Sequence, residues 1–93
     1  MSRIDMNLGT KEVAVDDEPV SLTPTEYEIC ELLARRRGQV LSREQIRVSA
    51  LGWDSDADDA AISMHVSRAR KKLASAGVDP IATVWGVGYK WQL

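Results

Sequence analysis

The fold follows from one stretch of sequence, Asp59-Ala60-Ala61-Ile62-Ser63-Met64-His65-Val66-Ser67-Arg68-Ala69-Arg70-Lys71-Lys72-Leu73. Its apolar residues recur at i, i+4, i+7 and i+11, which makes one stripe on a helix: Ile62, Val66, Ala69 and Leu73. The pattern predicts an amphipathic helix from about Asp59 to Ala76, with Gly77 as its end. The apolar stripe is expected to face a core, and the other side to face solvent.

Toward the C-terminus, this helix is followed by a predicted β-hairpin. Asp79-Pro80 reads as a turn, and Ile81–Val84 and Gly88–Leu93 read as strands around a glycine-containing tight turn. Trp91 is expected to close the core. Trp85, at the turn, could either pack inward or project outward, and the sequence leaves both possibilities open.

Toward the N-terminus, two further helices begin with capping boxes. Thr23 precedes Pro24 and has Glu26 three residues later, and Ser42 stands in the same relation to Gln45. Glycines are expected to end these helices, at Gly38 and Gly52.

The first 22 residues alternate apolar and polar side chains, which predicts three short strands in an antiparallel sheet: around Ile4–Leu8, Val13–Val15 and Val20–Leu22. Strands, three helices and a terminal hairpin make an α+β chain. This order predicts a winged helix-turn-helix, formed as a single domain over residues 1–93.

The charge of the chain is unevenly distributed. The net charge of the 93 residues is −2, and the first 28 residues hold seven acids against two basic residues, Arg3 and Lys11. From Ile62 onward only Asp79 opposes a set of cations: Arg68, Arg70, Lys71, Lys72 and Lys90. Such a chain can present a basic face to a polyanion, although ordinary surface solvation would give a similar composition.

Several classes of protein are disfavoured by the sequence. No apolar run reaches the roughly 20 residues of a membrane helix, and the first residues lack a secretory h-region, so a cytoplasmic setting is expected. Cys30 is a lone cysteine in an apolar helical pattern, and His65 is the single histidine. Without a metal-ligand spacing, a nucleophile–base pair or a phosphate loop, we expect neither an enzyme nor a cofactor.

The polar side of the predicted third helix suits a DNA major groove. Arg68 could bond guanine bidentately, serines could bond bases or phosphates, and Met64 could touch a thymine methyl. Lys71 and Lys72 would attract phosphates. An ordinary surface helix would look similar, so this helix alone does not decide the function.

Four segments in register add a family resemblance. They are Leu22-Thr23-Pro24-Thr25-Glu26-Tyr27-Glu28, Gly38-Gln39-Val40-Leu41-Ser42-Arg43-Glu44-Gln45, Val66-Ser67-Arg68-Ala69-Arg70-Lys71-Lys72-Leu73 and Thr83-Val84-Trp85-Gly86-Val87-Gly88-Tyr89-Lys90. Together they resemble the OmpR/PhoB-type winged-helix effector domain over essentially the whole chain.

This resemblance implies a four-stranded N-terminal sheet before the three helices and the hairpin. It also implies the output domain of a two-component response regulator in a phosphorelay, which binds direct repeats of double-stranded DNA as head-to-tail pairs. The loop 52–58 would contact RNA polymerase. The receiver domain is absent from the sequence, so the chain is either an excised domain or a stand-alone version.

The resemblance also carries over individual DNA contacts. Base-reading positions fall on Ser63, Met64 and Arg68, and the wing position that often holds a minor-groove arginine is Trp85. Phosphate-contacting positions that keep a suitable side chain are Arg43, His65, Ser67, Arg70, Thr83 and Tyr89, to which charge adds Lys71.

Departures from the family pattern lower the affinity for DNA that we expect. Ala60-Ala61 stands where Arg-Thr is usual, Ser67 replaces a common arginine, and Leu51 takes the place of a tryptophan, with Trp53 displaced by two. Each lost phosphate contact lowers affinity. The alternative is therefore a winged-helix protein-interaction module with weak or lost DNA binding.

Overall fold

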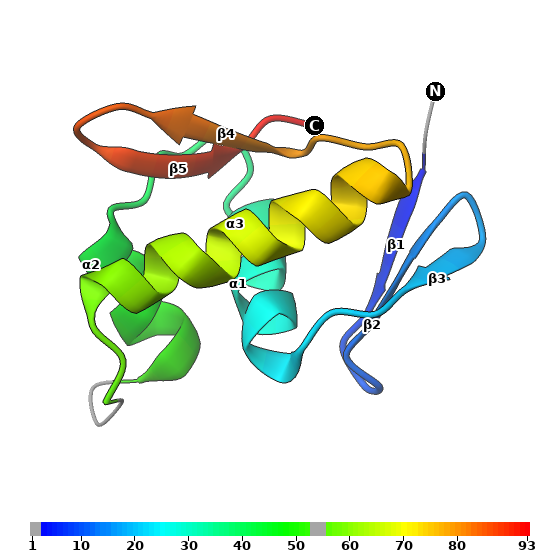
Figure 1. Cartoon of the computed structure of the whole chain (residues 1–93), viewed down its shortest axis with the longest axis horizontal. Helices are drawn as coiled ribbons and strands as arrows, with labels where there is room; N and C mark the ends of the chain where they lie inside the picture. The colour runs from blue at the N-terminus through cyan, green and yellow to red at the C-terminus, as the bar shows by residue number, and fades with distance from the viewer. Residues whose placement is uncertain (1–2, 53–55) are drawn as a thin grey trace.

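A computed structural model describes residues 3–52 and 56–93 of the chain (Figure 1). The elements run in the order β1 (Ile4–Asn7), β2 (Glu12–Val15), β3 (Glu18–Val20), α1 (Pro24–Arg35), α2 (Arg43–Ile46), η1 (Arg47–Leu51), α3 (Asp59–Ser75), β4 (Ile81–Val84) and β5 (Gly88–Trp91). This is the α+β winged-helix order that the sequence predicts.

The N-terminal sheet has three antiparallel strands in the order β1-β2-β3. The four strands implied by the family resemblance are therefore wrong for the described residues, and the third strand ends at Val20 rather than Leu22. The Leu22 N–H bonds the Val20 carbonyl at 3.1 Å, so the chain already turns toward its helix cap there. Among the described residues before Thr23, only β1, β2 and β3 form strands.

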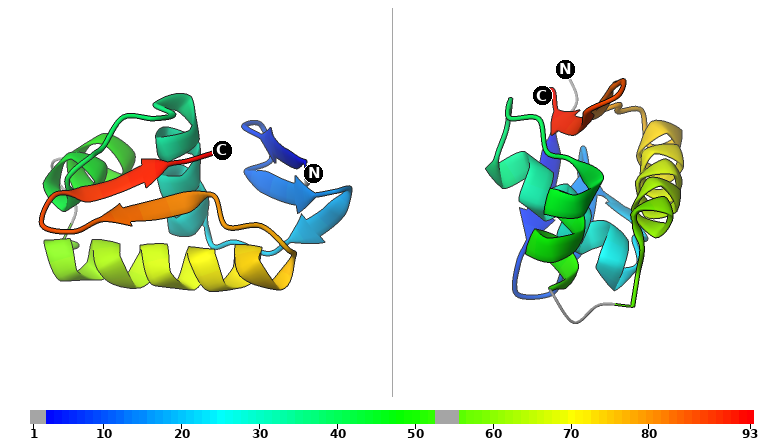
Figure 2. Two further views of the ribbon diagram at one scale, coloured as in Figure 1. Left: turned by 90° about the horizontal axis from the view of Figure 1, so that it is seen from above. Right: turned by 90° about the vertical axis from the view of Figure 1, so that its left-hand side faces the viewer.

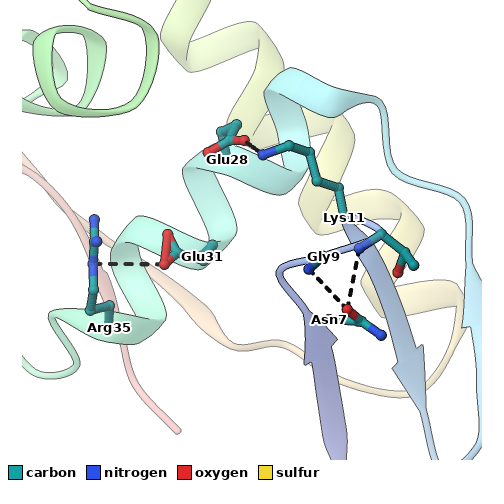
Figure 3. Close-up of polar contacts among 7 residues, drawn as sticks. Asn7, Gly9, Lys11, Glu28, Glu31 and Arg35 are labelled. Carbon is teal, nitrogen blue, oxygen red and sulfur yellow. Dashed lines mark hydrogen bonds and ion pairs between the residues drawn. The ribbon is translucent and has the colours of Figure 1, made fainter.

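The sheet is tied to α1 through the turn between β1 and β2 (Figure 3). The Asn7 Oδ1 accepts the N–H groups of Gly9 at 2.9 Å and Thr10 at 3.2 Å, which shapes the turn. Lys11 then forms an ion pair with Glu28 of α1. This hydrogen bond to Glu28 raises the pKa of Lys11.

The core lies where α1 and α3 pack together, and α3 buries its predicted apolar stripe. Ile62, Val66, Ala69 and Leu73 are the buried residues of α3. From α1 the core receives Tyr27, Ile29, Cys30, Leu32 and Leu33. Cys30 is fully buried, and burial raises the pKa of its thiol to about 12, so it packs as an apolar residue.

The second helix is less regular than the sequence predicts. Both capping boxes are present, with Glu26 N–H to Thr23 Oγ1 and Gln45 N–H to Ser42 Oγ each at 3.1 Å. After one α-helical turn, however, the chain widens into the π-helical segment η1 before ending at Gly52, where φ is 90°. Trp53 and the middle of the loop 52–58 lie outside the described residues.

Candidate nucleic-acid interface

Helix α3 lies next to the hairpin β4–β5 (Figure 2), and its polar residues are those left outside the core. Four of the predicted DNA-contacting side chains are exposed on it: Met64, Ser67, Arg68 and Lys71. Ser63, His65 and Arg70 are half-buried between this side and the core. Arg68 forms no hydrogen bond or ion pair within the described residues, so its guanidinium is available to a ligand.

Ser63 links three elements at the start of this surface. Its Oγ lies 3.3 Å from the Arg43 Nη1 and 3.3 Å from the Tyr89 hydroxyl. Arginine can only donate, and the tyrosine hydroxyl is placed as a second donor, so both lone pairs of Ser63 are engaged. The Ser63 hydroxyl is then left to act as a donor, which suits a phosphate oxygen or a base acceptor rather than an amino group.

Arg70 is held against the hairpin instead of extending into solvent. Its Nη1 donates to the Thr83 Oγ1 at 2.8 Å, and its Nε lies 3.9 Å from the Asp79 carboxylate. These contacts fix how β4 lies relative to α3. They also reduce the positive charge that Arg70 presents to solvent.

The space between α3 and the hairpin is a cleft of about 490 Å³. It brings together seven of the residues singled out in the sequence: Ser63, Ser67, Arg70, Lys71, Thr83, Trp85 and Tyr89. A neighbouring cleft of about 370 Å³, which Ser63 also lines, adds Arg43. Residues inferred from separate segments of sequence therefore line two adjoining clefts, whereas Met64, His65 and Arg68 of α3 line neither.

The hairpin turn answers the question left open for Trp85. The Val87 N–H bonds the Val84 carbonyl at 3.0 Å, and Gly86 has φ of 78°, as the third position of a type II turn requires. Trp85 projects from this turn with 90% of its surface exposed, whereas Trp91 is only 5% exposed and closes the core. Trp85 is thus a surface residue.

The base of the hairpin is fastened to the chain between α1 and α2. The Leu41 N–H bonds the Tyr89 carbonyl at 2.8 Å, and the Tyr89 N–H bonds the Leu41 carbonyl at 2.9 Å. The backbones approach so closely at Gly88 that an added Cβ would lie 1.9 Å from the Leu41 oxygen. Only glycine fits there.

Lys72 has a different role from the phosphate attraction expected for it. Its Nζ donates to the Glu26 carboxylate at 2.6 Å, and Glu26 is only 1% exposed. The pair joins the C-terminal half of α3 to the start of α1. Sequence reasoning missed this contact because 46 residues separate the partners.

A search for similar proteins identifies the class of protein that this fold and site define. Residues 17–91 match the family model described as "Transcriptional regulatory protein, C terminal". The chain is 43% identical over 86 residues to the transcriptional regulatory protein SpaR of Bacillus subtilis, covering 92% of the chain and 39% of that protein. It is 41% identical over 81 residues to the response regulator protein PmrA of Pseudomonas aeruginosa, covering 87% and 35%.

Solved structures of similar proteins point to the same family. The DNA-binding domain of the response regulator AdeR, crystallised in complex with an intercistronic region, superposes with a TM-score of 0.85 at 30% identity, covering 96% of this chain and 93% of that one. The DNA-binding domain of CpxR from E. coli gives a TM-score of 0.80 at 34% identity, covering 99% and 96%.

The chain therefore belongs to the family of C-terminal domains of transcriptional regulatory proteins. Its winged-helix fold is that of the DNA-binding domains of AdeR and CpxR. It spans about two fifths of the length of the curated relatives, 39% of SpaR and 35% of PmrA. Within the described residues, no helix is long and apolar enough to cross a membrane.

Proposed function

We propose that the chain binds double-stranded DNA sequence-specifically, with α3 in the major groove and the β4–β5 hairpin at the adjacent minor groove. The observation that carries this proposal is the shared surface of α3 and the hairpin, where Lys71, Thr83 and Tyr89 line one cleft and Arg68 is exposed on α3. The AdeR domain, which has the same fold, was crystallised with DNA.

Each side chain has a role that suits its place. Arg68 is free to bond guanine O6 and N7, Met64 offers an apolar contact, and Ser63 offers a hydroxyl donor. The remaining contacts position the protein on phosphates: Arg43, His65, Ser67, Arg70, Lys71, Thr83 and Tyr89.

The relatives support a proposal for the larger setting of this domain. As one domain, residues 1–93 would serve as the cytoplasmic output half of a two-component response regulator, controlled by a receiver domain in a phosphorelay. Pairs of copies would bind direct repeats head to tail, with half-sites about one turn of DNA apart. The loop 52–58 would contact RNA polymerase.

Selection of bound sequences from random duplex DNA tests this proposal. We expect an enriched site with a fixed half-site spacing. On that site, Arg68→Ala should lower affinity by about 1–3 kcal/mol and relax the preference at one base pair. An equal loss on all DNA sequences would show that Arg68 does not read a base.

A second candidate is a protein-interaction module that has kept the fold. The net charge of −2 and the uncharged side chains at Ala60, Ala61 and Ser67 favour it. Titration with mixed-sequence duplex at low salt and then at increasing salt separates the two. Absence of binding at the lowest salt would leave only the interaction module.

A further inference from the structure

The tip of the hairpin is apolar and projects into solvent. Trp85 is 90% exposed and Val87 is 56% exposed, on either side of Gly86. Burying an indole is among the larger apolar gains open to a side chain, yet Trp91, six residues later, is taken into the core and Trp85 is not. The turn geometry at Gly86 holds Trp85 outward.

The surroundings of the tip are those of a polyanion contact. The cleft that reaches Trp85 from below also contains the Arg43 side chain, and Lys90 follows on β5. On its other side the tip adjoins the cleft lined by Lys71, where Arg70 is already paired with Asp79. An apolar tip bordered by cations fits DNA, whose apolar base stack lies between two rows of phosphates.

The base of the hairpin is held by hydrogen bonds to two other parts of the molecule. Two backbone hydrogen bonds pair Tyr89 with Leu41, and the Tyr89 hydroxyl reaches Ser63 on α3. The turn between β4 and β5 therefore extends from a base attached to both α3 and the segment before α2. These attachments would limit displacement of the tip when it contacts a ligand.

We infer that Trp85 acts as an apolar wedge, entering the minor groove and partly unstacking one base step. This inference rests on the proposed function and names how the wing contributes to it. Apolar side chains inserted in this way kink the duplex, and pyrimidine–purine steps such as TA and CA/TG deform most easily. The wing would thus select DNA by deformability, at a position where an arginine would select by charge.

The test uses the full chain and duplexes selected by the wild type, with 2-aminopurine placed in the step that faces the wing. We expect binding to raise 2-aminopurine fluorescence, and a TA step to bind more tightly than a GC step at the same place. Trp85→Ala should abolish the fluorescence rise and weaken binding roughly 5- to 150-fold, the range for loss of a base–aromatic contact. Its thermal midpoint should not change, because the side chain is 90% exposed.

Two further variants sharpen the result. Trp85→Arg should keep much of the affinity through charge but give no fluorescence rise. Leu8→Ala removes a side chain that is 65% exposed and follows directly after β1. Strand β1 and the β4–β5 turn lie at opposite ends of the molecule (Figure 1), so this variant should change neither readout.

The outcomes are distinguishable. If Trp85→Ala binds as tightly as the wild type, or if the wild type binds without any rise in fluorescence, the wedge is excluded while DNA binding stands. If the wild type selects no duplex at all, the proposed function itself fails and the wedge with it.

Discussion

Glu26 is a buried carboxylate that depends on its donors. Burial alone would raise its pKa, but the hydrogen bonds from Lys72 and from the Thr23 N–H, at 2.6 and 3.0 Å, outweigh burial and lower it. A depressed folded-state pKa stabilises the protein above the unfolded value, and this stability is lost as the pH falls through the folded value. We expect Glu26→Gln to unfold more easily by about 1–3 kcal/mol at pH 7.

Urea denaturation between pH 7 and pH 3 checks this expectation, because the difference between wild type and Glu26→Gln should shrink toward acid. Lys72→Met should be destabilised at pH 7 as well, since it leaves the Glu26 charge buried. Lys71→Met, one residue earlier and exposed, is the matched control and should unfold like the wild type. A Lys72→Met variant as stable as this control would contradict the role given to the pair.

Tyr27 offers a gain in stability. Its hydroxyl is buried and has no hydrogen-bond partner within the described residues, and burial raises its pKa. An unpaired buried hydroxyl opposes folding, so Tyr27→Phe should raise the free energy of unfolding by roughly 1 kcal/mol. The ring would keep its contact with the Lys11 ammonium, 5.8 Å from its centroid. Thermal unfolding measures the change, and a loss of stability would reveal a partner for this hydroxyl.

Among the elements, the sequence was most informative where a local rule sets the structure. The stripe of α3 and both capping boxes were predicted and are confirmed, because helical periodicity and capping depend on residues three or four apart. The π-helical end of the second helix was not predicted, since it has no such local signature. The predicted DNA contacts themselves remain predictions.

Contacts between side chains that are far apart in the sequence could not be predicted from the sequence. Lys72 and Arg70 look alike as cations on one helix, yet one meets Glu26 and the other meets Thr83 and Asp79. Trp85 and Trp91 likewise share a strand-and-turn context but differ in burial. Such differences are decided by which elements pack together.

The hairpin should fail as a unit if its base is disturbed. In Gly88→Ala the new methyl group would meet the Leu41 carbonyl, so the pairing of Leu41 with Tyr89 must break. We expect a loss of about 2–4 kcal/mol, in the range of a severe steric substitution. Faster hydrogen exchange at the Leu41 and Tyr89 amides should accompany this loss.

Gly86→Ala is the matched control for this element. Its φ of 78° makes alanine unfavourable, but nothing lies within 4 Å of the added carbon. It should lose only about 1 kcal/mol, and its exchange at Leu41 should stay slow. Equal exchange rates in the two variants would show that the close approach does not hold the hairpin.

At the scale of the whole molecule, charge and distance act together. The chain measures 34 × 27 × 20 Å, and the turn of Asp16, Asp17 and Glu18 lies by the C-terminal end of α3, where Asp16 and Glu18 share a cleft with Lys72 and Ser75. The Debye length is about 30 Å in 0.01 M salt but about 8 Å in 0.15 M salt. These acids should therefore repel DNA mainly in dilute salt.

The triple variant Asp16→Asn, Asp17→Asn, Glu18→Gln tests this idea. Asparagine tolerates the positive φ of 50° and 70° at the first two positions, so the turn is kept. We expect several-fold tighter DNA binding in 0.01 M salt and less than about a two-fold change in 0.15 M salt. Lys71→Gln should weaken binding at both. A triple variant with the same gain at both concentrations would place the acids in direct contact with DNA.

The attachment of Tyr89 to Leu41 divides the hairpin into a fixed base and a three-residue tip. Nothing in the core depends on the exposed side chains of Trp85 and Val87. The two tip side chains can therefore be substituted without loss of the fold. A library randomised at these two positions, with Gly86 and Gly88 retained, should yield folded proteins with new operator preferences. Relatives could diverge in the genes they control by the same route, without altering the scaffold that positions the helix.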